Sequence, residues 1–110
     1  MKRYPVIILP SAEMNIGAAY AWIAGRDEAA AVRWYHQLME VIFSLDHFPE
    51  RCPLAPESKF FRLEIREIFH GRRQYKYRIL FTVSEKEVQV LHVRHGALLA
   101  LGESELPEAE

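Results

Sequence analysis

The pattern of apolar and polar positions changes within the first dozen residues of the chain. Residues 4–9 hold a short apolar run between two prolines, which predicts a first strand. From Ser11 onward the apolar residues follow the spacing of a helix, at Ile16, Ala19, Tyr20 and Ile23. We expect Ser11 to be the N-cap of this helix and Gly25 to end it.

A second helix follows after a very short turn, with Asp27 as its expected N-cap. Its apolar positions alternate in steps of three and four, at Ala31, Trp34, Leu38, Val41 and Leu45. A stripe this broad can pack against a helix and a sheet at the same time. The short turn predicts an antiparallel helical hairpin, with Trp34, Leu38 and Leu45 in the core.

The segment "DHFPERCPLAPESKF" is rich in proline, which excludes a regular element there, and after it the apolar period becomes two. One predicted strand contains Phe61, Leu63 and Ile65, and "FHGRRQ" interrupts the pattern. The next predicted strand contains Tyr75, Tyr77, Ile79, Phe81 and Val83. A turn at "SEKE" leads to "VQVLHVRH", which is apolar on both faces and predicts a central strand. The order β-α-α-β-β-β predicts an α+β fold, with the helical hairpin packed on one face of a mainly antiparallel four-stranded sheet.

Charge is distributed unevenly along a chain whose formal net charge is only −1. Nine basic and four acidic residues lie between Lys59 and Arg94, while residues 103–110 contain four glutamates and no cation. Residues 1–102 therefore form the predicted domain. We expect residues 103–110 to be an acidic, disordered tail, because the segment has too few apolar side chains to fold alone.

The basic residues gather at the start of one predicted strand, in "GRRQYKYRILF". If Tyr77, Ile79 and Phe81 face the helices, Lys76 and Arg78 point to the opposite face. No predicted helix remains to cover that face, so we expect an open basic surface beside the loop with Arg72 and Arg73. Such a surface suits phosphates or an acidic partner, although a solvated sheet face is the simpler interpretation.

The order of these elements resembles the RelE/ParE superfamily, the toxins of type II bacterial toxin–antitoxin systems. The matching segments are "PSAE", "AAAVRWYHQLMEVIFSLDHFPERC", "EIREIFHGRRQYKYRILFTV" and "VQVLHVRHGA". The resemblance implies a cytoplasmic toxin that inhibits growth, supports plasmid stabilisation and forms a complex with a small cognate antitoxin. RelE-like members cut mRNA on the ribosome, whereas ParE-like members poison DNA gyrase. The basic residues Arg72, Arg73, Lys76 and Arg78 are the candidates for antitoxin or target binding.

Metal-free RNA cleavage would need an acid, a base and cations around the phosphate. The candidates are His95 for proton transfer and Arg66, Arg78 and Arg94 as cations. Alternatively, Arg94 and His95 close the end of the sheet and bind the antitoxin. The sequence "RHGALLAL" lacks the aromatic residue expected of an interferase after His95, and its "HG" looks ParE-like, although Ala97 and Leu98 stand where ParE-like chains often continue with arginines.

These features favour a ParE-like toxin that acts on DNA gyrase. The alternatives are a ribosome-dependent mRNA interferase, and a degenerate relative that binds an antitoxin without being toxic. The spacing of the histidines predicts no metal site, no cofactor motif is present, and no apolar stretch approaches the ~20 residues that span a membrane.

Overall fold

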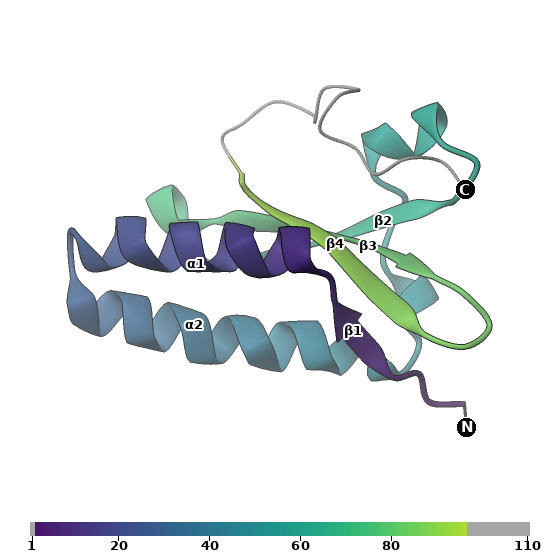
Figure 1. The fold of residues 1–110 in the computed structure, drawn as a ribbon, viewed down its shortest axis with the longest axis horizontal. Coiled ribbons are helices and arrows are strands. Elements are labelled where there is room, and N and C mark those ends of the chain that lie inside the picture. Colours follow the sequence, from purple (N-terminus) through teal and green to yellow (C-terminus); the bar gives the residue numbers. More distant parts are fainter. Residues whose placement is uncertain (1, 97–110) are drawn as a thin grey trace.

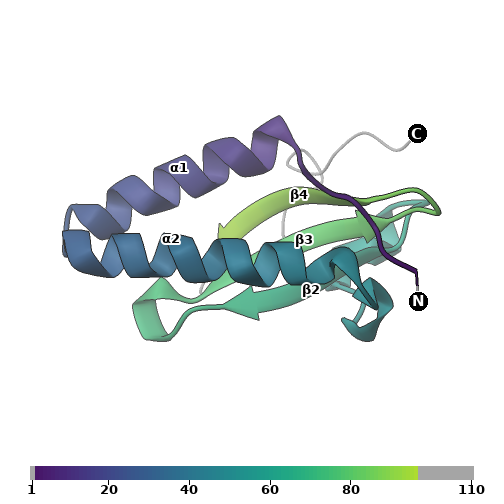
Figure 2. The ribbon, with the colours of Figure 1, turned by 90° about the horizontal axis from the view of Figure 1, so that it is seen from below.

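The computed structural model describes residues 2–96, in which a helical hairpin covers one face of a four-stranded sheet (Figures 1 and 2). The strand order is β1-β4-β3-β2, with bounds β1 (Val6–Ile8), β2 (Ile65–His70), β3 (Tyr77–Val83) and β4 (Val88–His95). Strand β1 is parallel to β4, and the other pairs are antiparallel. The predicted element order, the mainly antiparallel sheet and the central place of "VQVLHVRH" are therefore confirmed. The predicted tail, residues 103–110, and its boundary at residue 102 lie outside the described residues.

Helix α1 (Pro10–Ala24) begins two residues earlier than predicted, and Ser11 is not its N-cap. Leu9 holds the N-cap position, since Pro10 is well suited to the first helical position. The Ser11 hydroxyl instead donates to the Leu91 carbonyl over 2.7 Å. One turn later the Asn15 Oδ1 atom accepts from the Val93 backbone N–H over 3.1 Å. The first turns of α1 thus bind the backbone of β4 beyond the point where β1 ends.

Helix α2 (Glu28–Phe43) starts as predicted, because the Asp27 carboxylate accepts from the Ala30 N–H over 3.0 Å. Trp34, Leu38 and Leu45 are buried against α1 and the sheet, which confirms the predicted core. Figure 2 shows the two antiparallel helices lying along the strands. From the sheet, Tyr77, Ile79 and Phe81 enter the same core.

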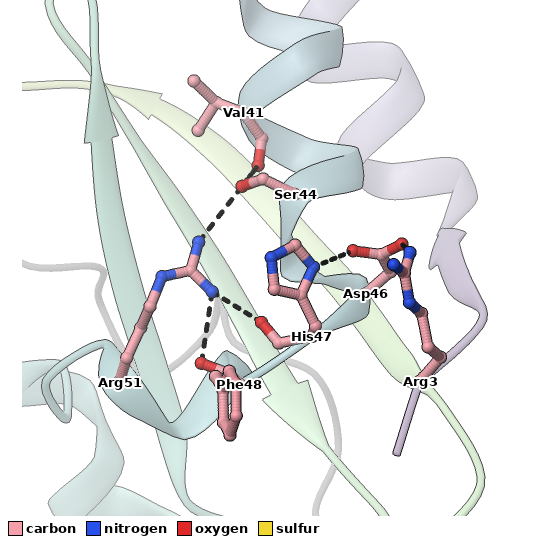
Figure 3. Close-up of polar contacts among 7 residues, drawn as sticks. All are labelled: Arg3, Val41, Ser44, Asp46, His47, Phe48 and Arg51. Atoms are coloured by element: carbon pink, nitrogen blue, oxygen red, sulfur yellow. Dashed lines mark hydrogen bonds and ion pairs between the residues drawn. The ribbon is translucent and has the colours of Figure 1, made fainter. Parts of the chain in front are cut away.

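The chain leaves α2 through two short 3₁₀ turns, η1 (Ser44–Asp46) and η2 (Pro49–Arg51), which Arg51 holds together (Figure 3). The Arg51 guanidinium donates to the carbonyls of His47 and Phe48 and to the Ser44 hydroxyl, over 2.8, 3.1 and 3.1 Å. The neighbouring carboxylate of Asp46 pairs with the His47 ring and with Arg3, and these contacts lower the pKa of Asp46. The exit from the helix is therefore fixed by side-chain contacts rather than by a regular element.

The proline-rich segment continues through a third 3₁₀ turn, η3 (Pro56–Phe60), onto the sheet face opposite the helices. There Ala55 packs with Ile65, Leu80 and Leu91 in a second, smaller core. Backbone bonds join this segment to β2, from the Ala55 N–H to the Ile65 carbonyl over 2.7 Å and from the Glu67 N–H to the Pro53 carbonyl over 3.1 Å. The expectation that this face is left uncovered is wrong over this half of the sheet.

The second strand is displaced along the chain from its predicted position. Residues 61–64 precede β2, which continues through Phe69 and His70, so the interruption is shorter than "FHGRRQ". Phe61 packs beside the second core, while Leu63 is exposed. The first part of the apolar alternation, before Ile65, therefore belongs to the irregular segment that covers the sheet and not to the strand.

Candidate functional site

Arg78 lies on the sheet face opposite the helices, and two carboxylates enclose it. Its Nη1 and Nη2 atoms donate to the two oxygens of Glu57 over 2.9 and 2.8 Å, and its Nε atom donates to Glu67 over 3.0 Å. Arg78 is 6% exposed and Glu57 is fully buried. The hydrogen bonds that Arg78 donates to Glu57, and next those to Glu67, raise the pKa of Arg78, so its guanidinium stays charged and the two carboxylates neutralise it locally.

The expectation that Arg78 lies on an open basic surface is therefore wrong. The reason is Glu57, which η3 brings onto the strand from a position 21 residues away in the chain. Lys76 is exposed as expected, with its ammonium 4.8 Å from the centre of the Phe69 ring. Arg72 and Arg73 are exposed as well. The basic surface therefore consists of these two arginines in the loop before β3 and of Lys76, which directly precedes the strand.

The other two candidate cations lie on different faces of the sheet. Arg94 is the register partner of Arg78 across β3 and β4, and it is partly exposed on the same face. Arg66 is opposite Phe81, whose ring belongs to the core under the helices. Its guanidinium donates to the Cys52 carbonyl over 2.6 Å and pairs with Glu64 over 3.3 Å.

His95 packs on the helix side of the sheet, at the end of β4. Its ring lies edge-on to Tyr77 and Trp22, with centroid distances of 5.1 and 5.9 Å. Its Nε2 atom is 2.5 Å from the Gln74 carbonyl, which can only accept, so Nε2 carries a proton in this contact. Arg94 and His95 both line a shallow cleft of ≈ 250 Å³ that Asn15 and Trp22 complete.

The loop before β3 is a tight turn that depends on Gly71. Its φ angle is +94°, and a Cβ atom added there would lie 2.0 Å from the Tyr75 carbonyl oxygen. The turn closes through bonds from the Tyr75 and Lys76 N–H groups to the carbonyls of Arg72 and Arg73, over 2.9 and 3.2 Å. Only glycine fits at position 71, and the turn holds both arginines outward.

An apolar groove on the outer side of the helical hairpin was missed in the sequence. It has a volume of ≈ 420 Å³ and is lined by Ile16, Gly17, Tyr20, Val32, Tyr35 and His36. The rings of Tyr20 and Tyr35 meet edge to face, 6.0 Å apart. The sequence contains one indication of this groove. Val32 and Tyr35 lie beside the buried stripe of α2, and Gly17 on α1 has no side chain that would fill the space between the helices.

Neither a metal cluster nor a membrane-spanning helix is found in the part of the chain that the structure describes. Residues 2–96 contain no group of three or more His, Cys, Asp or Glu side chains placed to hold a metal ion. Within the same residues, no helix is both long and apolar enough to cross a bilayer.

The chain thus folds as a helical hairpin on a β1-β4-β3-β2 sheet, with a basic loop before β3. Its sequence also matches a known protein family. Residues 6–98 match the family described as ParE toxin of the type II toxin–antitoxin system, parDE. The chain belongs to this family, which lies within the RelE/ParE superfamily that the sequence resembled. It is therefore a toxin of a type II toxin–antitoxin system, and the family implies an antitoxin partner. No individual curated protein matched the sequence.

Proposed function

We propose that this toxin acts on DNA gyrase in the cytoplasm, inhibits growth, supports plasmid stabilisation and is neutralised in a complex with a cognate antitoxin. Membership of the ParE toxin family supports this proposal. One geometric observation favours it over RNA cleavage. The four residues that would perform metal-free cleavage do not all converge on one point, because Arg66 and Arg78 lie away from the cleft that Arg94 and His95 line.

Cleavage requires the proton-transfer group and the phosphate-binding cations to surround the same reacting atoms. His95 and Arg66 lie on the helix side of the sheet, at opposite ends of it, whereas Arg78 and Arg94 lie on the other face. Arg78 is further bound by Glu57 and Glu67, whose carboxylates would repel a phosphate. A gyrase inhibitor needs a binding surface instead, and most residues of such a surface contribute little individually.

The alternative, a ribosome-dependent mRNA interferase, rests on the cleft shared by Arg94 and His95. A cation and a titratable ring at one cleft could serve one step of phosphodiester cleavage. In this interpretation Arg94 would contact the phosphate and His95 would transfer the proton, and Arg66 and Arg78 would support the surrounding structure.

The test is to induce the toxin and its His95→Ala variant and to measure gyrase supercoiling and mRNA integrity in parallel. Gyrase inhibition by both proteins, with mRNA intact, supports the proposal. Codon-phased mRNA cleavage that disappears in His95→Ala would establish the interferase instead. A folded protein that binds its antitoxin and produces neither effect would be a non-toxic binding module.

The antitoxin would bind the exposed basic residues Arg72, Arg73 and Lys76 together with the apolar groove on the hairpin. An acidic segment with apolar anchors complements both surfaces. Arg78 would contribute only by holding the sheet together, because its hydrogen bonds are already made.

A further inference from the structure

The proline-rich segment has an apolar cleft, which we call the η3 cleft because η3 supplies part of its lining. Its volume is ≈ 370 Å³, and its apolar lining includes Leu54, Phe61 and Leu63. Leu54 and Leu63 are 48% and 46% exposed, and Phe60, next to Phe61 in the chain, is 50% exposed. Large apolar side chains that gather on one surface mark binding sites. Figure 1 shows η3 on the side of the sheet away from the two helices.

The walls of the η3 cleft are fixed by hydrogen bonds to β2 and β3. The Ile65 N–H donates to the Ser58 hydroxyl over 3.0 Å, and the Thr82 hydroxyl donates to the Glu64 carbonyl over 3.0 Å. Ser58 and Glu64 both line the cleft. The cleft is therefore part of the folded structure, held against two strands.

The charged residues of the cleft lining leave an excess of positive charge. Lys59 and Arg62 are exposed, and neither forms a salt bridge with another residue within 2–96. The acid in the lining, Glu64, pairs with Arg66 over 3.3 Å. An occupant that combines an apolar side chain with neighbouring carboxylates complements both the apolar walls and the two cations.

The C-terminal segment of this chain has that combination. Residues 97–110 read "ALLALGESELPEAE", with three leucines among the first five residues and four glutamates after them. Leu106 directly follows Glu105 and precedes Glu108 by two residues. A segment of this composition has too few apolar residues to fold alone, but a surface of the folded domain can supply the missing apolar contacts.

The segment is also long enough to reach the η3 cleft. The described residues end at Gly96, whose N–H donates to the Lys76 carbonyl over 2.7 Å. Across the sheet, Gln89 pairs with Thr82 and Thr82 pairs with Ile65, next to the cleft. The way from Gly96 along β4 to Gln89 and across two strand spacings corresponds to a direct separation of about 25 Å. The chain from Gly96 to Leu106 spans up to about 33 Å when extended.

We propose that residues 97–110 dock on the sheet face opposite the helices, with Leu106 in the η3 cleft and Glu105 and Glu108 beside Lys59 and Arg62. The apolar residues 97–101 would then pass over the second core, in the same order as the surface presents it. Because the segment is tethered to the domain, its effective concentration is high and a small contact is sufficient. The docked segment closes the cleft to other partners. The proposal departs from the expectation of a disordered tail and is independent of whether the toxin acts on gyrase or on mRNA.

The test is paramagnetic relaxation enhancement in full-length ¹⁵N-labelled protein. A nitroxide is attached through Ala109→Cys in a Cys52→Ala background, and the spectra are compared before and after the nitroxide is reduced. We expect the intact label to broaden the amide signals of Leu54 and Leu63 selectively. Leu106→Ser should remove most of this broadening, because the apolar contact is lost. Broadening that persists in Leu106→Ser would overturn the assignment of this side chain to the cleft.

Two further arms test the charges and the source of the segment. The double variant Lys59→Gln, Arg62→Gln should reduce the broadening, whereas Arg33→Gln, which removes a cation from α2 on the other side of the sheet, should not. When ¹⁵N-labelled protein without nitroxide is mixed with unenriched protein that carries it, we expect no broadening. Broadening in that mixture would show that a second copy supplies the segment, and would overturn docking within one chain. Signals near the cleft that are unaffected in the singly labelled protein, or weak broadening spread over the whole surface, would overturn the docking site.

Discussion

Arg78 illustrates how a residue's surroundings decide its role. Three of its nitrogens donate to Glu57 and Glu67, and all three side chains are largely withdrawn from water. A buried ion pair adds little net stability compared with apolar residues, but the loss of one partner leaves the other charge without compensation. The interaction therefore stabilises the position of η3 on the sheet only while all its members are present.

We expect Arg78→Ala to lower the free energy of unfolding by about 3–5 kcal/mol, because Glu57 would remain buried without a cation. Denaturant unfolding followed by circular dichroism measures this change. Arg62→Ala removes an exposed arginine near the same segment and should change stability by less than about 0.5 kcal/mol. Equal effects of the two substitutions would mean that the Arg78 carboxylate contacts do not hold the segment.

His70 should make stability depend on pH. Burial lowers the pKa of His70 below its ordinary value of 6.5, although its hydrogen bond to the Trp34 carbonyl acts in the opposite direction. Below about pH 6.5 the unfolded chain therefore takes up a proton at this residue more readily than the folded protein does, so stability falls as the pH decreases.

The matched variant is His70→Gln, whose amide can still donate to the Trp34 carbonyl but does not titrate. We expect the wild-type protein to lose more unfolding free energy than the variant between pH 7 and about pH 5, and the two to run in parallel above pH 7. Chemical denaturation across this range provides the measurement. Parallel curves over the whole range would show that His70 is not the group responsible.

At the scale of elements, two glycines have opposite requirements. Gly17 is inside α1, and an added Cβ atom would meet nothing within 4 Å. Gly71 has a φ angle of +94°, and an added Cβ atom would collide with the Tyr75 carbonyl. Gly17 therefore destabilises its helix compared with alanine, whereas Gly71 is required by its turn.

Gly17→Ala should raise the free energy of unfolding by about 0.5–1 kcal/mol, because alanine favours the helix. Gly71→Ala should lower it by more than about 1 kcal/mol, because the turn cannot form without strain. Thermal unfolding of the two variants beside the wild type distinguishes these signs. A stabilising Gly71→Ala would indicate that the turn does not have this conformation in solution.

The elements that could be predicted from the sequence are those defined by a regular apolar period. The stripe containing Trp34 and Leu38 and the alternation around Ile79 identified α2 and β3 and the side chains that each contributes to the core under the helices. The path of the irregular segment could not be predicted, because no period describes how "PLAPESKF" crosses a sheet. Glu57 was therefore missed as the partner of Arg78, and the basic surface was predicted larger than it is.

The same limit applies to the candidate sites. Arg72 and Arg73 were predicted in a polar loop with glycine, and Lys76 was predicted on the open face from the strand alternation; all three are exposed. The η3 cleft could not be anticipated, because the irregular segment that forms it has no apolar period. The groove beside Tyr35 depends on the distance between two helices, which the sequence does not contain.

At the scale of the whole molecule, three exposed cations, Arg72, Arg73 and Lys76, lie close together in the chain around the loop before β3. We expect Lys76→Glu to weaken antitoxin binding and to make the remaining affinity less sensitive to salt. The reason is that salt screens the attraction between opposite charges, and the substitution removes part of that attraction. Lys86→Glu makes the same change at the β3–β4 turn and should have a much smaller effect. Titrations at two salt concentrations measure both, and equal behaviour of the variants would place the antitoxin elsewhere.

The bonds that α1 and the proline-rich segment make to the sheet also determine how a second chain could approach it. Unpaired strand edges invite another strand to add on, which leads to strand exchange or aggregation. Here Ser11 and Asn15 occupy the β4 backbone past β1, and Pro53 and Ala55 occupy the first half of β2. Among residues 2–96, the outer edge of the short strand β1 and the outer side of β2 around Phe69 are left as places for strand addition. A strand from a second chain would therefore find only short stretches of free backbone, which restricts both strand addition by a partner and self-association through the sheet.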